Sequence, residues 1–167
     1  MPFSNRISQT LHDEHSATAA LMERIEHLLG RYRGGNRPDA NDRAVAQLLT
    51  DVSAAVEADI ERHFAFEESS LFPYLESIGE DAIGAHLTED HRAMRPLGLR
   101  LAALARGACA AGFDGASWDE FRKIGQELCE RLLAHVQKEE GALLPLLDDS
   151  MDAETEAKLY GEYVGNE

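Results

Sequence analysis

The sequence predicts an all-α protein, an up-down-up-down four-helix bundle with a short C-terminal tail helix. Four long segments carry apolar residues at spacings of three and four, the period of an amphipathic helix. The stretches between them are short and polar, and runs of alternating β-branched residues, which would indicate strands, are nearly absent. Long amphipathic helices with short connections are typical of a bundle, here a single domain over residues 1–167.

The first two predicted helices cover residues 4–29 and 42–75. The first ends at residues 30–42, where Gly, Pro and Asn are typical of a loop. Its apolar stripe is Ile7, Leu11, Thr18, Met22, Ile25 and Leu29, and the stripe of the second is Val45, Leu49, Val52, Val56 and Ile60. Each stripe defines the face of a helix that turns toward the core.

The third and fourth predicted helices cover residues 81–105 and 118–147. Pro96 lies inside the third helix. Because proline lacks a backbone N–H group, we expect a kink or an irregular turn there. A short tail helix, over residues 152–163, is expected to pack on the outside of the bundle.

Charge and composition exclude several kinds of partner. The formal net charge of −15 is unsuited to nucleic acid or a membrane surface, because both attract clustered Lys and Arg. No stretch approaches the roughly 20 apolar residues of a membrane-spanning helix, and the first residues lack the apolar core of a signal peptide. Cys109 and Cys129 have no metal-binding spacing, so we expect reduced thiols and a cytoplasmic location.

Two segments that begin 72 residues apart repeat one pattern. Residues 63–75 read HFAFEESSLFPYL and residues 135–147 read HVQKEEGALLPLL, with six of thirteen positions identical. The shared residues are His, Glu, Glu, Leu, Pro and Leu, and both copies fall near the C-terminal end of a predicted helix. Chance does not readily place these residues in the same order twice, so the pattern indicates a shared role.

In each copy the histidine and the first glutamate lie on one face of the helix. Four residues bring Glu67 within about 40° of His63, and the same holds for Glu139 and His135. Both pairs continue the apolar stripe of their helix toward the core. A buried carboxylate is costly unless it is paired or metal-bound, so the two pairs predict a metal site. The second glutamate of each copy points about 100° away and is expected in solvent or behind the ligands.

The other two helices add inward-facing histidines. His15 continues the stripe of the first helix, with His12 to one side, and His91 continues the stripe of the third. His86 is five residues before His91, about 140° around the helix, and a local bulge would be needed to turn it inward. The candidate metal ligands are therefore His15, His63, Glu67, His86, His91, His135 and Glu139.

This set of donors favours a pair of metal ions. Imidazole with carboxylate suits iron, manganese or zinc, and no thiolate is needed. Two ions bridged by Glu67 and Glu139 would share the negative charge and keep open positions for a small molecule. A mononuclear zinc site is less favoured, because the chain has no HExxH motif.

The same segments make the chain resemble the hemerythrin-like, or HHE cation-binding, family. The resemblance rests on HDEH at 12–15, HFAFEESSLFPYL at 63–75, EDHRAM at 89–94 and HVQKEEGALLPLL at 135–147. It implies a centre of two Fe ions joined by an oxo or hydroxo bridge and by Glu67 and Glu139, with Mn or Zn as substitutes. Oxygen-carrying hemerythrins have two histidines one turn apart in the third helix and a longer spacing in the fourth, so this chain is closer to the bacterial branch.

The resemblance implies a non-haem di-iron protein that binds or responds to oxygen, nitric oxide or hydrogen peroxide at open iron positions. An alternative is a di-iron enzyme that reduces nitric oxide or peroxide, or a protein that donates iron. The sequence leaves open whether the chain is an enzyme. Tyr74, which follows the first repeat's proline, is expected to belong to the core.

Overall fold

The structure, a computed structural model, describes residues 2–165, and every regular element in that range is helical. The α-helices are α1 (Arg6–Arg31), α2 (Arg43–Ala58), α3 (Phe72–Ser77), α4 (Asp81–Ala111), α5 (Gly115–Lys138), α6 (Leu144–Ser150) and α7 (Ala153–Gly165). Three π-helical segments lie between them, namely η1 (Asp59–Phe64), η2 (Glu67–Leu71) and η3 (Glu139–Leu143). The prediction of an all-α bundle with a tail helix is confirmed.

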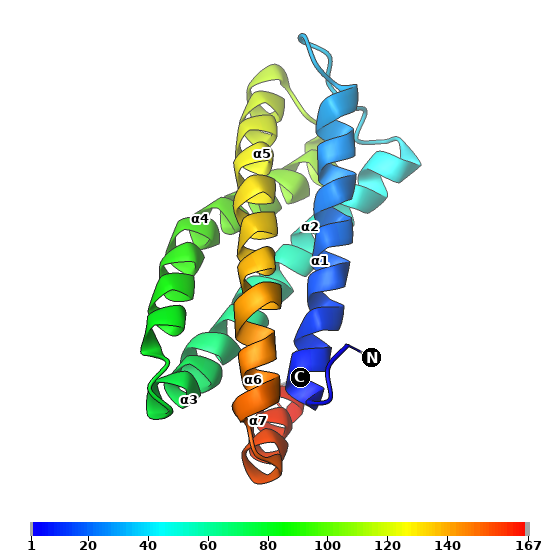
Figure 1. Cartoon of the computed structure of the whole chain (residues 1–167). Coiled ribbons are helices and arrows are strands. Elements are labelled where there is room, and N and C mark those ends of the chain that lie inside the picture. Colours follow the sequence, from blue (N-terminus) through cyan, green and yellow to red (C-terminus); the bar gives the residue numbers. More distant parts are fainter. Residues whose placement is uncertain (1, 166–167) are drawn as a thin grey trace.

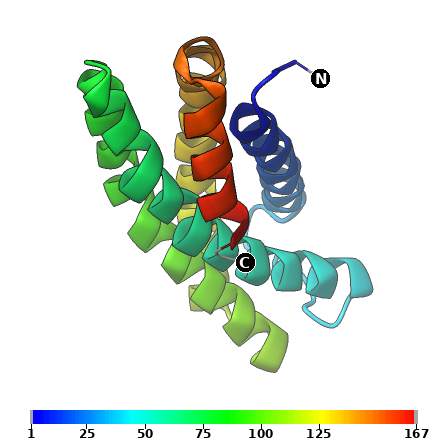
Figure 2. The same cartoon turned by 90° about the horizontal axis from the view of Figure 1, so that it is seen from below.

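Four helical rods form the bundle (Figure 1). α1 is the first rod and α4 the third. The second rod runs without interruption from α2 through η1 and η2 to α3, over residues 43–77, and the fourth from α5 through η3 to α6, over residues 115–150. Seen from below, α7 runs from the end of the fourth rod toward the space between α1 and the second rod (Figure 2).

The π-helical segments η2 and η3 occupy the same place in the two sequence repeats. Each begins at the first glutamate of its copy, Glu67 or Glu139, and is followed by an α-helix with proline in its first turn. The proline supplies no N–H group, so the regular α-helical hydrogen bonding is already broken there. In both segments the next backbone N–H group reaches five residues back, to the carbonyl oxygen of that glutamate.

The other proline has a milder effect. α4 stays helical through Pro96 and changes direction along its length (Figure 1). The helix ends at Gly112, where a φ of 78° favours glycine, and the next helix begins at a capping box formed by Asp114 and Ser117. The glycine thus ends the third rod, and the capping box starts the fourth rod a few residues later.

Two apolar cores are separated by a layer of buried polar side chains. One core lies toward the loop that joins α1 to α2 and includes Met22, Leu49, Val52, Leu101 and Phe121. The other lies toward α7 and includes Ile7, Leu71, Leu75, Leu143 and Leu147. The apolar stripe predicted for the second helix is buried throughout. None of the helices described is long and apolar enough to cross a membrane.

Candidate metal centre

Six of the seven predicted ligands meet in the polar layer between the cores. The carboxylates of Glu67 and Glu139 have no exposed surface, and none of the four histidines is more than 7 % exposed. These histidines are His15 on α1, His63 on the second rod, His91 on α4 and His135 on the fourth rod. A layer of imidazole and carboxylate groups therefore crosses the whole bundle, with all four rods contributing.

The structure places His86, the seventh predicted ligand, outside this layer. The helix α4 is a regular α-helix at this point, and the five residues from His86 to His91 turn the first imidazole away from the second. His86 is exposed and lies beside Ile83 and Lys138 on the outside of the bundle. The local bulge that would have brought it inward is absent from the described part of α4.

The six residues form two overlapping groups. In each group, one ligand atom from every member lies within 4.8 Å of the others. The first group is His15, His63, Glu67 and Glu139, and the second is Glu67, His91, His135 and Glu139. Both carboxylates belong to both groups, which is the arrangement that two neighbouring metal ions with shared carboxylate ligands require.

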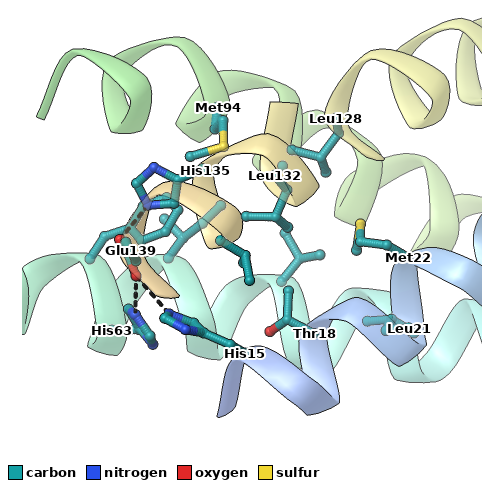
Figure 3. Close-up of a pocket in the computed structure, with 15 residues that line it drawn as sticks. His15, Thr18, Leu21, Met22, His63, Met94, Leu128, Leu132, His135 and Glu139 are labelled. Atoms are coloured by element: carbon teal, nitrogen blue, oxygen red, sulfur yellow. Dashed lines mark ion pairs between the residues drawn. The ribbon is translucent and has the colours of Figure 1, made fainter. Parts of the chain in front are cut away.

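Glu67 turns one oxygen toward each pair of histidines. Its Oε1 atom lies 2.8 Å from Nε2 of His63, and its Oε2 atom lies 3.1 Å from Nε2 of His91. Glu139 does the same, with Oε2 at 2.6 Å from Nε2 of His15 and Oε1 at 2.6 Å from Nε2 of His135 (Figure 3). Each carboxylate thus spans the two groups.

Several of these contacts are close but not aligned as hydrogen bonds. Among the residues described, Nε2 of His15, Oε2 of Glu67 and both carboxylate oxygens of Glu139 are buried without a hydrogen-bond partner. Buried polar atoms without partners are costly, and they are rare in native proteins. Buried nitrogen and oxygen atoms that lie close together without hydrogen-bond partners can share a cation, so these residues fit a metal site.

Every histidine of the layer is held from behind by an acidic side chain. Glu140 lies 2.6 Å from Nδ1 of His15, and Glu68 lies 2.9 Å from Nδ1 of His91. These are the second glutamates of the two sequence repeats, and each reaches a histidine on a neighbouring rod. An ionised carboxylate only accepts hydrogen bonds, so Nδ1 must donate. In the neutral imidazole Nε2 then has a free lone pair for a metal ion.

The remaining two histidines have acidic partners that sequence reasoning missed. Glu14 lies 2.9 Å from Nδ1 of His63, and Asp90 lies 3.1 Å from Nδ1 of His135. A signal was present in the sequence, because an acidic residue directly precedes both inward histidines of the first and third rods, in Glu14-His15 and in Asp90-His91.

The close packing of imidazoles and carboxylates shifts the pKa values of the buried residues in the metal-free protein. Burial disfavours an imidazolium, but the surrounding carboxylates outweigh it and raise the pKa of His15, His63 and His135. Burial would also raise the pKa of Glu139, yet the three imidazoles hold it well below its usual range. These directions favour protonated histidines in the metal-free protein, and a metal ion that binds their nitrogen atoms would have to displace those protons.

A small apolar cavity adjoins the layer on the side of the larger core. Its volume is about 30 Å³, enough for a molecule of the size of water or a diatomic gas. Figure 3 shows His15, His63 and His135 turned toward Glu139 at one end of the cavity, with apolar side chains around the rest. The lining includes Met22, Val56, Ile60, Met94, Leu128 and Leu132.

The other predicted positions have simpler environments. His12 is half-buried, and its Nδ1 atom lies 2.8 Å from Glu140, so it contacts the acid behind His15 and not the layer itself. Tyr74 is half-buried and places its hydroxyl 3.1 Å from Ser150, so it packs at the end of the bundle, away from the cluster.

Comparison with known proteins agrees with the geometry. No curated protein matches the chain. The sequence model of the hemerythrin HHE cation-binding domain matches residues 6–147, a range that includes all six residues of the layer and ends before α7. Buried histidine and glutamate side chains in this range form the potential metal site. The chain therefore belongs to the hemerythrin HHE cation-binding family.

Proposed function

We propose that this chain is a non-haem di-iron protein that binds or responds to a small ligand, such as oxygen, nitric oxide or hydrogen peroxide. The observation that carries the proposal is the pair of buried carboxylates, each with one oxygen toward either pair of histidines. One metal position would take His15 and His63, and the other His91 and His135. Both would share Glu67 and Glu139.

The donor set supports iron. Four imidazoles and two carboxylates without a thiolate suit iron, with manganese and zinc as competitors for the same donors. When bound, an iron pair would supply electrons and open positions for a small ligand. The protein's own contribution is to fix the imidazoles through their Nδ1 atoms and to keep bulk water out of the buried layer.

The adjoining cavity supports a small ligand. A space of about 30 Å³ lined mainly by aliphatic side chains and methionine has room for a diatomic molecule. The same cavity would serve an enzyme that reduces nitric oxide or peroxide, which is our second candidate function. Cys109 and Cys129 are free thiols, in keeping with the reducing cytoplasm that we propose as the location.

Metal analysis tests the first part of the proposal. The purified protein should contain about two iron ions per chain and should absorb light through charge transfer from a bridging oxygen. A colourless preparation that holds only zinc, even after iron is supplied without oxygen, would contradict the di-iron proposal.

Ligand mixing separates the two candidate functions. Protein reduced without oxygen is mixed in separate experiments with oxygen, nitric oxide and hydrogen peroxide, and both absorption and ligand consumption are followed. One stable adduct per iron pair supports binding or sensing. Consumption of many equivalents supports an enzyme. If none of the three ligands changed the absorption spectrum or was consumed, both candidate functions would be contradicted.

A further inference from the structure

We infer that Tyr163, on the tail helix α7, is a positioning residue for the metal position that takes His15 and His63. Through Glu14 it fixes the imidazole of His63, so that docking of α7 and metal binding at this position favour each other. The inference rests on the proposed metal centre and adds an element outside the range matched by the family, which ends at residue 147.

Tyr163 is buried where α7 meets the first and second rods. Its side chain is 1 % exposed, and its hydroxyl lies 2.6 and 2.5 Å from the two carboxylate oxygens of Glu14. Its ring lies 4.6 Å from the guanidinium carbon of Arg62 and 4.4 Å from the ring of Phe66, measured to ring centroids. Arg62 directly precedes His63 in the chain, so the tyrosine is fitted against the helix that carries this candidate ligand.

Glu14 joins the tyrosine to the histidine. Its Oε2 atom accepts from the phenol of Tyr163 at 2.5 Å and from Nδ1 of His63 at 2.9 Å. Burial, with Glu14 beside it, raises the pKa of Tyr163, so the phenol stays protonated and can donate.

Without the phenol, Glu14 would lose its anchor. The Glu14 side chain is 27 % exposed and could rotate toward water if only the histidine held it. His63 would then lack a fixed acceptor at Nδ1, and the aim of Nε2 toward the metal position would loosen. Loss of such partners behind a histidine ligand typically costs 10- to 100-fold in metal affinity.

The second metal position has a different support in the equivalent place. There Asp90 holds His135, and Lys138 of the same rod as His135 lies 2.8 Å from Asp90. This lysine is 42 % exposed and belongs to the four-rod bundle. The tail helix thus reaches only one of the two acids that precede inward histidines, so its docking should affect one metal position and not the other.

Separate contacts hold α7 to the bundle. Arg6 forms two hydrogen bonds of 2.8 Å with Glu156 at the surface, and its guanidinium lies over the ring of Tyr160. Glu156 and Tyr160 both precede Tyr163 in α7, and the contacts of Arg6 with them do not involve Glu14. Docking of the helix can therefore be weakened without a change to the buried contact of Tyr163.

The test is a stepwise titration of metal-free protein with Co²⁺, a spectroscopic probe for such sites. The step that His15→Ala removes is assigned to the first position, and the step that His91→Ala removes to the second. Tyr163→Phe should weaken the first step 10- to 100-fold and change the second less than twofold. Lys138→Met is the matched variant and should affect the second step alone.

A double-mutant cycle separates positioning from general loosening. In a Glu14→Gln background the effect of Tyr163→Phe should fall below twofold, whereas in an Asp90→Asn background it should persist in full. Equal losses in the two backgrounds, or losses at both metal positions, would overturn the inference. Unchanged Co²⁺ affinities in a folded Tyr163→Phe protein would do so as well.

A second variant and a second readout guard against misfolding. Arg6→Gln leaves the buried contact in place, weakens docking of α7, and should weaken the first step by a smaller factor. If docking of α7 strengthens metal binding, thermodynamic linkage requires that metal binding also stabilise the docking of α7. Co²⁺ at the first position should therefore slow backbone hydrogen exchange in α7. Equal exchange with and without Co²⁺ would overturn the inference. Wild-type protein that takes up no Co²⁺ and no iron would instead contradict the metal centre itself.

Discussion

Glu140 accepts a hydrogen bond from Nδ1 of His15 at 2.6 Å, although 125 residues separate the two in the chain. Glu68 stands in the same relation to His91, at 2.9 Å. The two consecutive glutamates of each repeat therefore have different roles. The first enters the polar layer, and the second holds a histidine of the neighbouring rod.

Removal of one of these outer acids should weaken metal binding without abolishing it. We expect Glu140→Gln to lower metal affinity 10- to 100-fold, because the amide cannot hold the Nδ1 proton of His15 as strongly as a carboxylate does. Titration of the metal-free protein with Fe²⁺ in the absence of oxygen would measure this. The exposed Glu23 offers a control, and Glu23→Gln should leave the affinity unchanged. Equal affinities for the two variants would show that the outer acid does not act on the site.

The shared carboxylates and the single histidines should give different metal contents. Glu139→Ala removes an oxygen ligand from both groups, so we expect the loss of both ions. His15→Ala removes a donor from one group only and should leave about one tightly held ion per chain. Metal analysis after gel filtration would distinguish the two, and His86→Ala should keep the wild-type content. A full complement of metal in Glu139→Ala would contradict the assignment of a shared carboxylate.

Metal uptake should release protons. The pKa of His15, His63 and His135 is raised in the metal-free protein, so these groups stay protonated above their ordinary value of about 6.5. A metal ion must displace those protons, so affinity should rise with pH until the raised pKa values are passed and then become constant. Calorimetric titrations in buffers of different ionisation enthalpy would count the protons. Binding without proton release at pH 7 would contradict this expectation.

The same groups should make the metal-free fold less stable at high pH. A histidine whose pKa is higher in the folded than in the unfolded chain contributes its full stabilisation below the unfolded value. That contribution is lost as the pH rises from about 6.5 through the raised folded values of His15, His63 and His135. Thermal unfolding of metal-free protein should therefore show a Tm that falls across this range. Metal-loaded protein should not show the fall, because its histidines are already deprotonated.

Gly98 lines the cavity, and a side chain at this position should reduce the cavity volume. A methyl group at Gly98 would come within 2.5 Å of Cδ1 of Ile60, the flexible end of a side chain that also lines the cavity. We expect Gly98→Ala to push Ile60 into the cavity and to slow or weaken the binding of nitric oxide to the reduced protein, at a stability cost of about 1–3 kcal/mol.

Gly125→Ala, on the neighbouring helix α5, is the matched control. Its added methyl group would lie 3.6 Å from its nearest neighbours, an ordinary contact, and it should gain about 0.5–1 kcal/mol of stability from the better helix propensity of alanine. Ligand binding should not change. If Gly98→Ala and Gly125→Ala bound nitric oxide equally well, the cavity would not be the ligand site.

The apolar period predicted the bundle and most of the polar layer because both depend on which face of a helix a residue occupies. His63 and His135 continue the stripes of their helices, and buried residues on either side confirm the direction. The same arithmetic placed His86 on another face of its helix, and only an added bulge would have turned it inward. The structure has no bulge there, so the periodicity alone gave the better prediction.

The parts that could not be predicted depend on irregular backbone or on distant contacts. A period of 3.6 residues does not reveal the π-helical turns that begin at Glu67 and Glu139, although the proline shared by both repeats was a sign of broken hydrogen bonding. The contact between Tyr163 and Glu14 joins residues 149 apart, and no local pattern indicates it. Tyr74, the tyrosine next to the motif, was expected in the core and packs partly buried against the core at that end of the bundle.

The first two rods and the last two carry equivalent groups in equivalent places. Each half has an acid followed by a histidine on one rod, and a histidine with two glutamates on the other. Each half supplies both imidazoles of one group, one shared carboxylate, and one acid that reaches across to the other half. Two identical helical hairpins placed face to face would contain every donor of the centre, so the chain has the chemistry of a symmetric dimer joined by a linker. Because the two halves belong to one chain, the residues around one metal position can change without the same change at the other. The tail helix α7 is an example, because it contacts Glu14 in the first half and not Asp90 in the second.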